Sequence, residues 1–271
     1  MYPAFRASWI KLRRPSLLWS TYGAVAAVIA LITAVTFLTA STGPTAGQAQ
    51  GPGPGRQIGG LTVAALSGAE GLLKGLTGGA TLLGVIALAV AAAAIAGEYS
   101  TGTLRTLLIR RPQRLRLLTG MWAAVATFAV GAALVAAVAS AATALLLAGG
   151  QGVDTTAWFT ADGWTTSLRS VGEVALATAG YATLGSALGV LMRAPVAAVA
   201  LSIAWLLPIE GILSGTVDGS ARWLPGQLLA AVASNGTAGV ALGTALITAT
   251  GYLVVAAVAA GASFARRDVT A

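Results

Sequence analysis

Long uncharged stretches recur along the chain and predict six membrane-spanning helices. A helix rises about 1.5 Å per residue and the hydrocarbon core of a bilayer is about 30 Å thick, so about 20 apolar residues cross it. Six stretches fit this requirement, and they cover residues 16–40, 78–97, 118–148, 174–192, 194–209 and 240–263. None of them carries the polar face, repeating about every 3.6 residues, that a soluble helical bundle needs. The pattern therefore predicts an all-α, polytopic integral membrane protein with a single transmembrane domain over residues 1–271.

The region between the first two predicted spans has two parts. The run Gly51-Pro-Gly-Pro-Gly55 excludes a continuous helix, because proline lacks a backbone N–H and clashes with the preceding turn. Residues 61–77 are apolar again, although they include Glu70 and Lys74. This second part is either an outer interfacial helix or an extension of the second span, and the pattern leaves both open.

A short amphipathic helix is predicted within residues 98–116, between the second and third spans. Its beginning is rich in residue types that favour helix N-caps, namely Ser100, Thr101 and Thr103. Its apolar side chains fall at positions i, i+3 and i+4 and form one stripe: Leu104, Leu107 and Leu108. Pro112 then ends the helix or forces a turn. Such a helix can lie on lipid headgroups or dock into a groove of another protein.

Composition excludes a soluble globular enzyme. Charged residues make up 9% of the chain and hydrophobic residues 56%, whereas a soluble domain carries about 25% charged residues. Histidine and cysteine are absent, which removes disulfides, thiolate or imidazole metal sites and a Ser-His-Asp triad. The two lysines, Lys11 and Lys74, do not follow the glycine pattern of a phosphate-binding P-loop. We therefore expect no catalytic residue and no metal site.

The net charge of +8 is explained by topology. Twelve basic residues fall on the side of the N-terminus: Arg6, Lys11, Arg13, Arg14, Arg105, Arg110, Arg111, Arg114, Arg116, Arg193, Arg266 and Arg267. Four fall on the opposite side: Arg56, Lys74, Arg169 and Arg222. Lys and Arg collect at the cytoplasmic ends of membrane helices. Both termini are therefore expected in the cytoplasm, and the basic charge is attributed to the membrane rather than to nucleic acid.

Two further features of the spans have alternative interpretations. Glu210 follows Pro208 near the outer end of the fifth span. An acid at this depth is either a transport-pathway residue or a boundary residue of a re-entrant outer helix. The spacings Gly185-x-x-x-Gly189 and Gly239-x-x-x-Gly243 permit close helix approach. Because the chain has 35 glycines, such spacings also arise by chance.

The segment that begins at Glu98 resembles the permease subunits of type-2 ATP-binding-cassette (ABC) transporters. Glu98 is followed by Tyr-Ser-Thr-Gly-Thr-Leu-Arg-Thr-Leu-Leu and then by Arg-Arg-Pro-Gln-Arg. The resemblance extends along the chain through Trp9-Ile-Lys-Leu-Arg-Arg-Pro15 before the first span, Arg222-Trp-Leu-Pro225 before the last, and Phe264-Ala-Arg-Arg-Asp268 at the end.

The resemblance implies that residues 98–116 contain a cytoplasmic coupling helix seated in a cleft of a separate ATPase subunit. Its ATPase-facing residues would be Glu98, Thr103, Leu104, Leu107, Leu108, Arg110, Arg111 and Arg114. Residues 1–15 would form an interfacial helix that also contacts the ATPase, with Trp9, Lys11, Arg13 and Arg14 on it. ATP and Mg²⁺ would bind to the ATPase, and two permease halves, identical or related, would form the transporter.

The expected function is export of a substrate across the inner membrane of a bacterium. Walls rich in alanine and leucine suit a hydrophobic substrate, although they also suit plain exposure to lipid. The alternative is a polytopic scaffold, immunity or sensor component that transports nothing. A secondary transporter is disfavoured, because ion coupling needs ionisable groups inside the spans and few are present.

Overall fold

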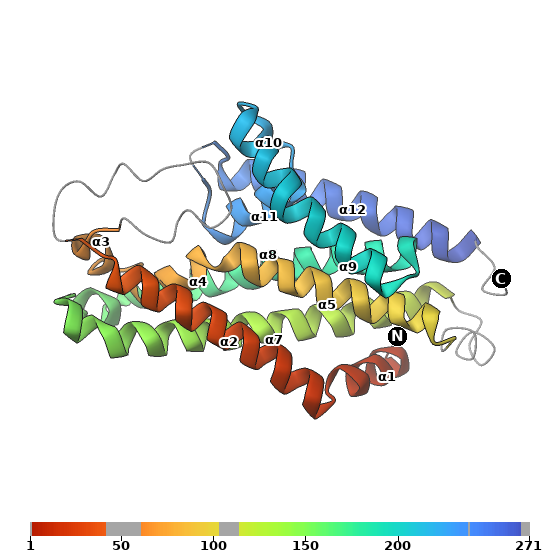
Figure 1. Cartoon of the computed structure of the whole chain (residues 1–271), viewed down its shortest axis with the longest axis horizontal. Helices are drawn as coiled ribbons and strands as arrows, with labels where there is room; N and C mark the ends of the chain where they lie inside the picture. Colours follow the sequence, from red (N-terminus) through yellow and green to blue (C-terminus); the bar gives the residue numbers. More distant parts are fainter. Residues whose placement is uncertain (1, 42–60, 103–113, 238, 267–271) are drawn as a thin grey trace.

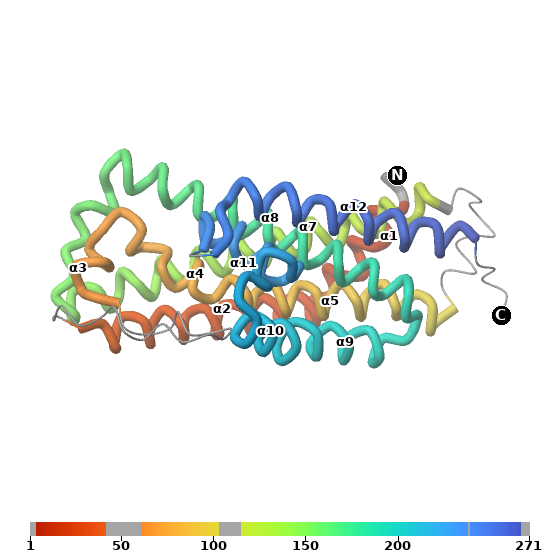
Figure 2. Tube along the Cα trace, turned by 90° about the horizontal axis from the view of Figure 1, so that it is seen from above, coloured from red at the N-terminus to blue at the C-terminus, as the bar shows by residue number. Residues whose placement is uncertain are grey.

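The protein is described by a computed structural model that covers residues 2–41, 61–102, 114–237 and 239–266. These residues fold into helices and loops without a named strand. Six helices are long and apolar enough to cross a membrane, which confirms the predicted all-α polytopic class. They are α2 (Pro15–Leu38), α5 (Ala80–Ser100), α7 (Arg114–Ala148), α8 (Ala161–Met192), the α9–η4–α10 rod (Pro195–Thr216) and α12 (Leu242–Arg266). Figures 1 and 2 show most of them running lengthwise along the molecule, whereas the α9–η4–α10 rod crosses the bundle obliquely in Figure 1.

Shorter elements cover the ends of this bundle. The N-terminal helix α1 (Tyr2–Leu12) packs against α7, and α11 (Pro225–Ala233) packs against α8 and α12. Between α2 and α5 lie α3 (Val63–Leu66), η1 (Gly71–Leu73) and α4 (Lys74–Gly78). The 3₁₀ turns η2 (Gly149–Gln151) and η3 (Thr156–Phe159) join α7 to α8, and η5 (Ser220–Arg222) precedes α11.

Prolines set the beginning of several helices. Pro15, Pro195 and Pro225 each occupy the first turn of α2, α9 and α11, where the missing N–H costs nothing because first-turn N–H groups have no helical partner. Ala194, before Pro195, is extended, as the proline ring requires of its predecessor. The boundary between the fourth and fifth helices therefore falls at residues 193–194.

Helix α8 is the central element of the bundle. It contacts α5, α7, α9, α11 and α12. In its most apolar window 61% of the residues are buried within the protein, against 22% for the α9–η4–α10 rod and 17% for α12. The last two therefore present most of their apolar side chains to the surroundings, where lipid can cover them.

Two boundaries differ clearly from the sequence-based expectation. Helix α8 begins at Ala161 rather than at residue 174, because Thr160 caps it through Gly163 N and an Arg169–Glu173 pair supports its polar first turns. The fifth helix continues beyond residue 209 to Thr216. Pro208 does not break it, because a π-helical turn, η4 (Trp205–Ile209), accommodates the ring.

The 61–77 segment matches neither alternative considered from its sequence. It is divided into α3, η1 and α4 rather than forming one outer helix, and Gly79 separates it from α5. Leu66, Leu72 and Leu76 are buried, and Trp158 Nε1 donates a hydrogen bond of 2.9 Å to Leu66 O. The segment is therefore part of the core rather than a surface helix.

Helix α1, the end of α5 and the end of α12 lie at the same end of the molecule (Figure 1). Side-chain contacts between these elements agree with the picture: the Tyr99 ring meets Phe264 of α12 edge-on, with centroids 6.3 Å apart. The opposite end carries α3, η2 and η3. We call the end that holds α1 and the ends of α5 and α12 the basic end, because it includes Lys11 of α1, Arg13 and Arg14 just after α1, and Arg266 of α12.

Candidate functional site

The candidate site is the basic end, around the last turn of α5. Ser100 Oγ and Thr101 Oγ1 both donate to Gly97 O, at 3.1 and 2.9 Å. Gly102 follows in the left-handed conformation, with φ +68°, which favours glycine and commonly ends a helix. Ser100 and Thr101 therefore belong to the end of α5, and the helix that they were expected to cap lies outside the described residues.

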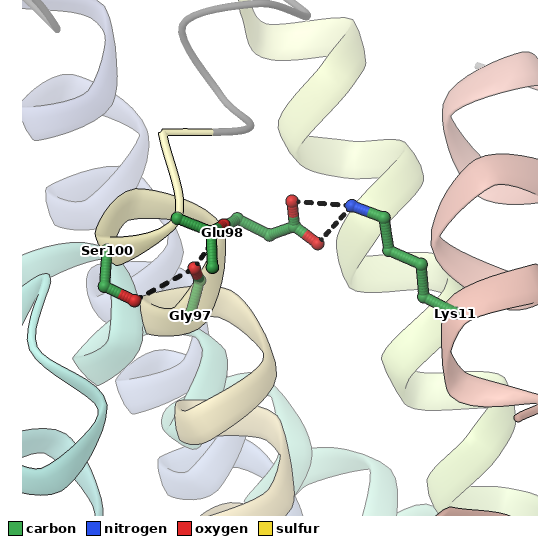
Figure 3. Close-up of polar contacts among 5 residues, drawn as sticks. Lys11, Gly97, Glu98 and Ser100 are labelled. Carbon is green, nitrogen blue, oxygen red and sulfur yellow. Dashed lines mark hydrogen bonds and ion pairs between the residues drawn. The ribbon is translucent and has the colours of Figure 1, made fainter.

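Glu98 in this last turn is paired with Lys11 of α1 (Figure 3). Lys11 Nζ lies 2.7 Å from Oε1 and 2.8 Å from Oε2 of the carboxylate. The Glu98 side chain is 14% exposed and that of Lys11 40% exposed. An acid near the C-terminus of a helix is opposed by the helix dipole, so the cation of α1 offsets an otherwise unfavourable position.

One face of α1 holds it against the bundle. Leu12 is buried, and Phe5 and Trp9 pack beside it on the same apolar cluster as Ile95, Met121 and Phe264. The Phe5 and Trp9 rings are stacked, 6.0 Å apart with an interplanar angle of 9°. Arg13 and Arg14, at the junction with α2, are exposed. Helix α1 is therefore amphipathic, and its position is fixed by both apolar packing and the ion pair.

A second charged side chain, that of Arg193, lies close to the end of α5. Arg193 lies between α8 and α9 in the left-handed conformation, with φ +57°. Its guanidinium carbon is 5.3 Å from the centroid of the Tyr99 ring, a distance at which a cation is attracted to the ring face. Tyr99 also contacts Phe264. The end of α5 thus links α1, the α8–α9 junction and α12.

Most of the predicted coupling helix lies outside the described residues. This applies to Thr103, Leu104, Leu107, Leu108, Arg110 and Arg111. Arg114 is the first residue of α7, and its side chain is likewise outside the described part. Of the predicted site, the structure brings Glu98 and Lys11 together and places Trp9, Arg13 and Arg14 on or beside α1.

Glu210 belongs to a different part of the molecule. Its side chain is fully buried, and it accepts hydrogen bonds from Trp205 Nε1 at 2.8 Å, Gly226 N at 3.1 Å and Gln227 N at 3.0 Å. The last two are first-turn amides of α11, so the carboxylate satisfies N–H groups that have no helical partner. Tyr181 Oη donates to Gly226 O at 2.7 Å. Glu210 therefore fixes the beginning of α11, and Pro208 lies in the π-helical turn before it.

Sequence reasoning named Lys11 and Glu98 separately and missed their pairing, together with the roles of Tyr99 and Arg193. One signal pointed to the pair: Glu98 is the only acid that precedes Asp268 on the predicted basic side. A carboxylate surrounded by many cationic side chains is expected to form an ion pair with one of them. No comparable signal marked Tyr99, because its contacts depend on how three distant helices pack.

The chain belongs to a family described as protein of unknown function (DUF2705), which matches residues 65–270, well over half of the chain. The matched region begins within α3 and includes α5 and all later elements. No curated protein matches the chain.

Proposed function

We propose that the chain, as a member of this family, is the membrane-spanning permease subunit of an ABC transporter that exports its substrate. A separate ATPase subunit binds ATP and Mg²⁺, and two permease copies or relatives assemble in the inner membrane of a bacterium. The basic end faces the cytoplasm, in agreement with the positive-inside rule, so both termini are cytoplasmic. The proposal rests on the motif at residues 98–116 and on the six apolar helices.

The observation that carries the proposal is the Lys11–Glu98 pair. The resemblance assigns ATPase contact to two elements, the N-terminal helix and the segment after the second span. The ion pair joins these two elements at 2.7 Å, so a force on either is transmitted to the other. A scaffold that transports nothing has no evident need for this link.

Helix α5 offers a route for that force into the bundle. It is continuous from Ala80 to Ser100, and it packs closely on α8, the central helix. In the proposed mechanism, ATP-driven closure of two ATPase subunits moves the 98–116 segment. The displacement passes along α5 to α8 and changes the side of the membrane to which the substrate pathway opens.

The test is co-purification of the ATPase from the native host in mild detergent. The double substitution Leu107→Asp and Leu108→Asp places two charges on the predicted apolar stripe, and we expect it to abolish recovery of a P-loop ATPase while membrane insertion is kept. Leu168→Asp is the matched control, because Leu168 is 70% exposed near the beginning of α8, at the other end of the molecule.

Retention of the ATPase by the double variant contradicts the coupling role. Failure of the unmodified chain to recover any P-loop ATPase contradicts the transporter itself and favours the scaffold, immunity or sensor alternative.

A further inference from the structure

A cavity of about 400 Å³ lies between α5, α8, the α9–η4–α10 rod, α11 and α12. This volume lies within the range of pockets that hold small organic molecules, roughly 300–1,000 Å³. Its walls are almost entirely apolar side chains, among them Leu88, Leu184, Leu188 and Ala256. The cavity is distinct from the basic end, where the ATPase is proposed to bind.

The cavity has a buried floor and an accessible rim. Leu88, Ala187 and Glu210 are 2%, 3% and 0% exposed and form part of the floor. Leu201 and Trp205 are 39% and 42% exposed and lie at the rim. Because both rim residues belong to one of the two least buried spans, the cavity is reached from the side of the fifth helix.

The polar groups of the lining are already engaged, and one of them is the carboxyl group of Glu210, whose oxygens accept only N–H donors, as an ionised carboxylate does. Ser202 Oγ donates to Ala198 O at 2.6 Å, and Trp205 Nε1 donates to Glu210. Glu210 accepts three N–H groups but has no ion-pair partner among the described residues. The cavity thus combines apolar walls with a negative group whose charge no cation of the described chain neutralises.

We propose that this cavity binds hydrophobic cations. The apolar body of the ligand would fill the space between α8 and α12, and its positive charge would be attracted by Glu210 through the low-dielectric wall. The Trp205 ring at the rim adds a face that attracts cations. A neutral apolar ligand would gain only from the walls. As an assignment of substrate class this rests on the proposed function, whereas the binding itself is a property of this chain alone.

The experiment measures binding of radiolabelled tetraphenylphosphonium to the purified full chain in nanodiscs of zwitterionic lipid, with empty nanodiscs as background and no ATPase present. We expect saturable binding. Unlabelled tetraphenylphosphonium should displace the label at least tenfold more effectively than uncharged triphenylmethane, because only the cation responds to Glu210.

Two variants locate the site. Ala256→Phe fills the cavity from α12 without touching the hydrogen bonds of Glu210, and Glu210→Gln removes the charge at nearly constant size; each should weaken binding at least tenfold. Ala262→Phe is the matched control, because Ala262 is exposed on the same helix and does not line the cavity.

Absence of saturable binding overturns the inference, as does unchanged binding by Ala256→Phe. Equal displacement by triphenylmethane overturns the assignment to cations even if Glu210→Gln fails to fold. This result can be distinguished from a failure of the proposed function. If the chain binds the cation but no ATPase co-purifies with it, the binding site is supported and the transporter proposal is contradicted.

Discussion

Lys11 and Glu98 are separated by 87 positions in the sequence and form a short, half-buried ion pair. The other ion pairs that we see among the described residues, Lys74–Glu70 and Arg169–Glu173, each join residues only four positions apart. The Lys74–Glu70 and Arg169–Glu173 pairs support local turns, whereas the Lys11–Glu98 pair fixes α1 relative to α5. At the scale of the residue, this contact adds a polar link between α1 and α5 to the apolar packing of α1.

A double-mutant cycle measures the strength of this contact. Glu98→Gln and Lys11→Gln, singly and together, should give a coupling free energy of unfolding of about 1 kcal/mol, because the carboxylate is largely shielded from water. The same cycle on the Lys74–Glu70 pair, whose carboxylate side chain is 65% exposed, is the control and should give about 0.3–0.5 kcal/mol. Thermal unfolding of the purified chain in detergent provides both values. A coupling at Lys11–Glu98 no larger than the control value would refute a fixing role for the pair.

At the scale of the element, glycines bring α5 and α8 together. A Cβ atom added at Gly185 would lie 2.2 Å from Leu88 O, and one at Gly189 would lie 2.8 Å from Ala92 O. Both obstacles are backbone atoms of α5, so the two helices would have to separate. At Gly239 and Gly243 nothing lies within 4 Å. Gly185 and Gly189 therefore pack closely against α5, whereas Gly239 and Gly243, which have the same spacing in the sequence, have no close neighbour.

Gly185→Ala should therefore destabilise the protein by about 1–3 kcal/mol, the usual cost of overpacking. Gly172→Ala is the matched control in the same helix, because nothing lies within 4 Å of its added Cβ; it should be neutral or stabilising by up to about 1 kcal/mol. Thermal unfolding in detergent compares the two variants. Equal stability of Gly185→Ala and Gly172→Ala would show that the close contact is not required.

Sequence reasoning succeeded where one strong physical signal acts alone. Long apolar runs bounded by charges located the six helices, and proline and charge located the break near Arg193. It failed where distant residues decide the outcome. The polar first turns of α8 gave no apolar signal, and the division of the 61–77 segment depends on burial of Leu66 and Leu76 against other helices. The capping of α11 by Glu210 joins residues 16 positions apart through side-chain geometry that no periodicity reveals.

At the scale of the whole molecule, charge and packing distinguish two regions of the bundle. The basic end joins α1, α5, α12 and the α8–α9 junction through an ion pair and ring contacts. The apolar cavity beside Glu210 lies deeper, between α5, α8 and the fifth and sixth spans. Helices α5 and α8 take part in both regions. In the proposed mechanism, these two shared helices connect the ATPase-binding end to the cavity.

The most direct test of this account is photo-cross-linking in living cells from a photoreactive amino acid at position 107, with the cross-linked partner identified by mass spectrometry. The account predicts a covalent product with a P-loop ATPase that is absent when the same group stands at the exposed position 168. Cross-linking of position 107 to lipid alone, or its labelling from outside the cell by an impermeant reagent, would contradict it.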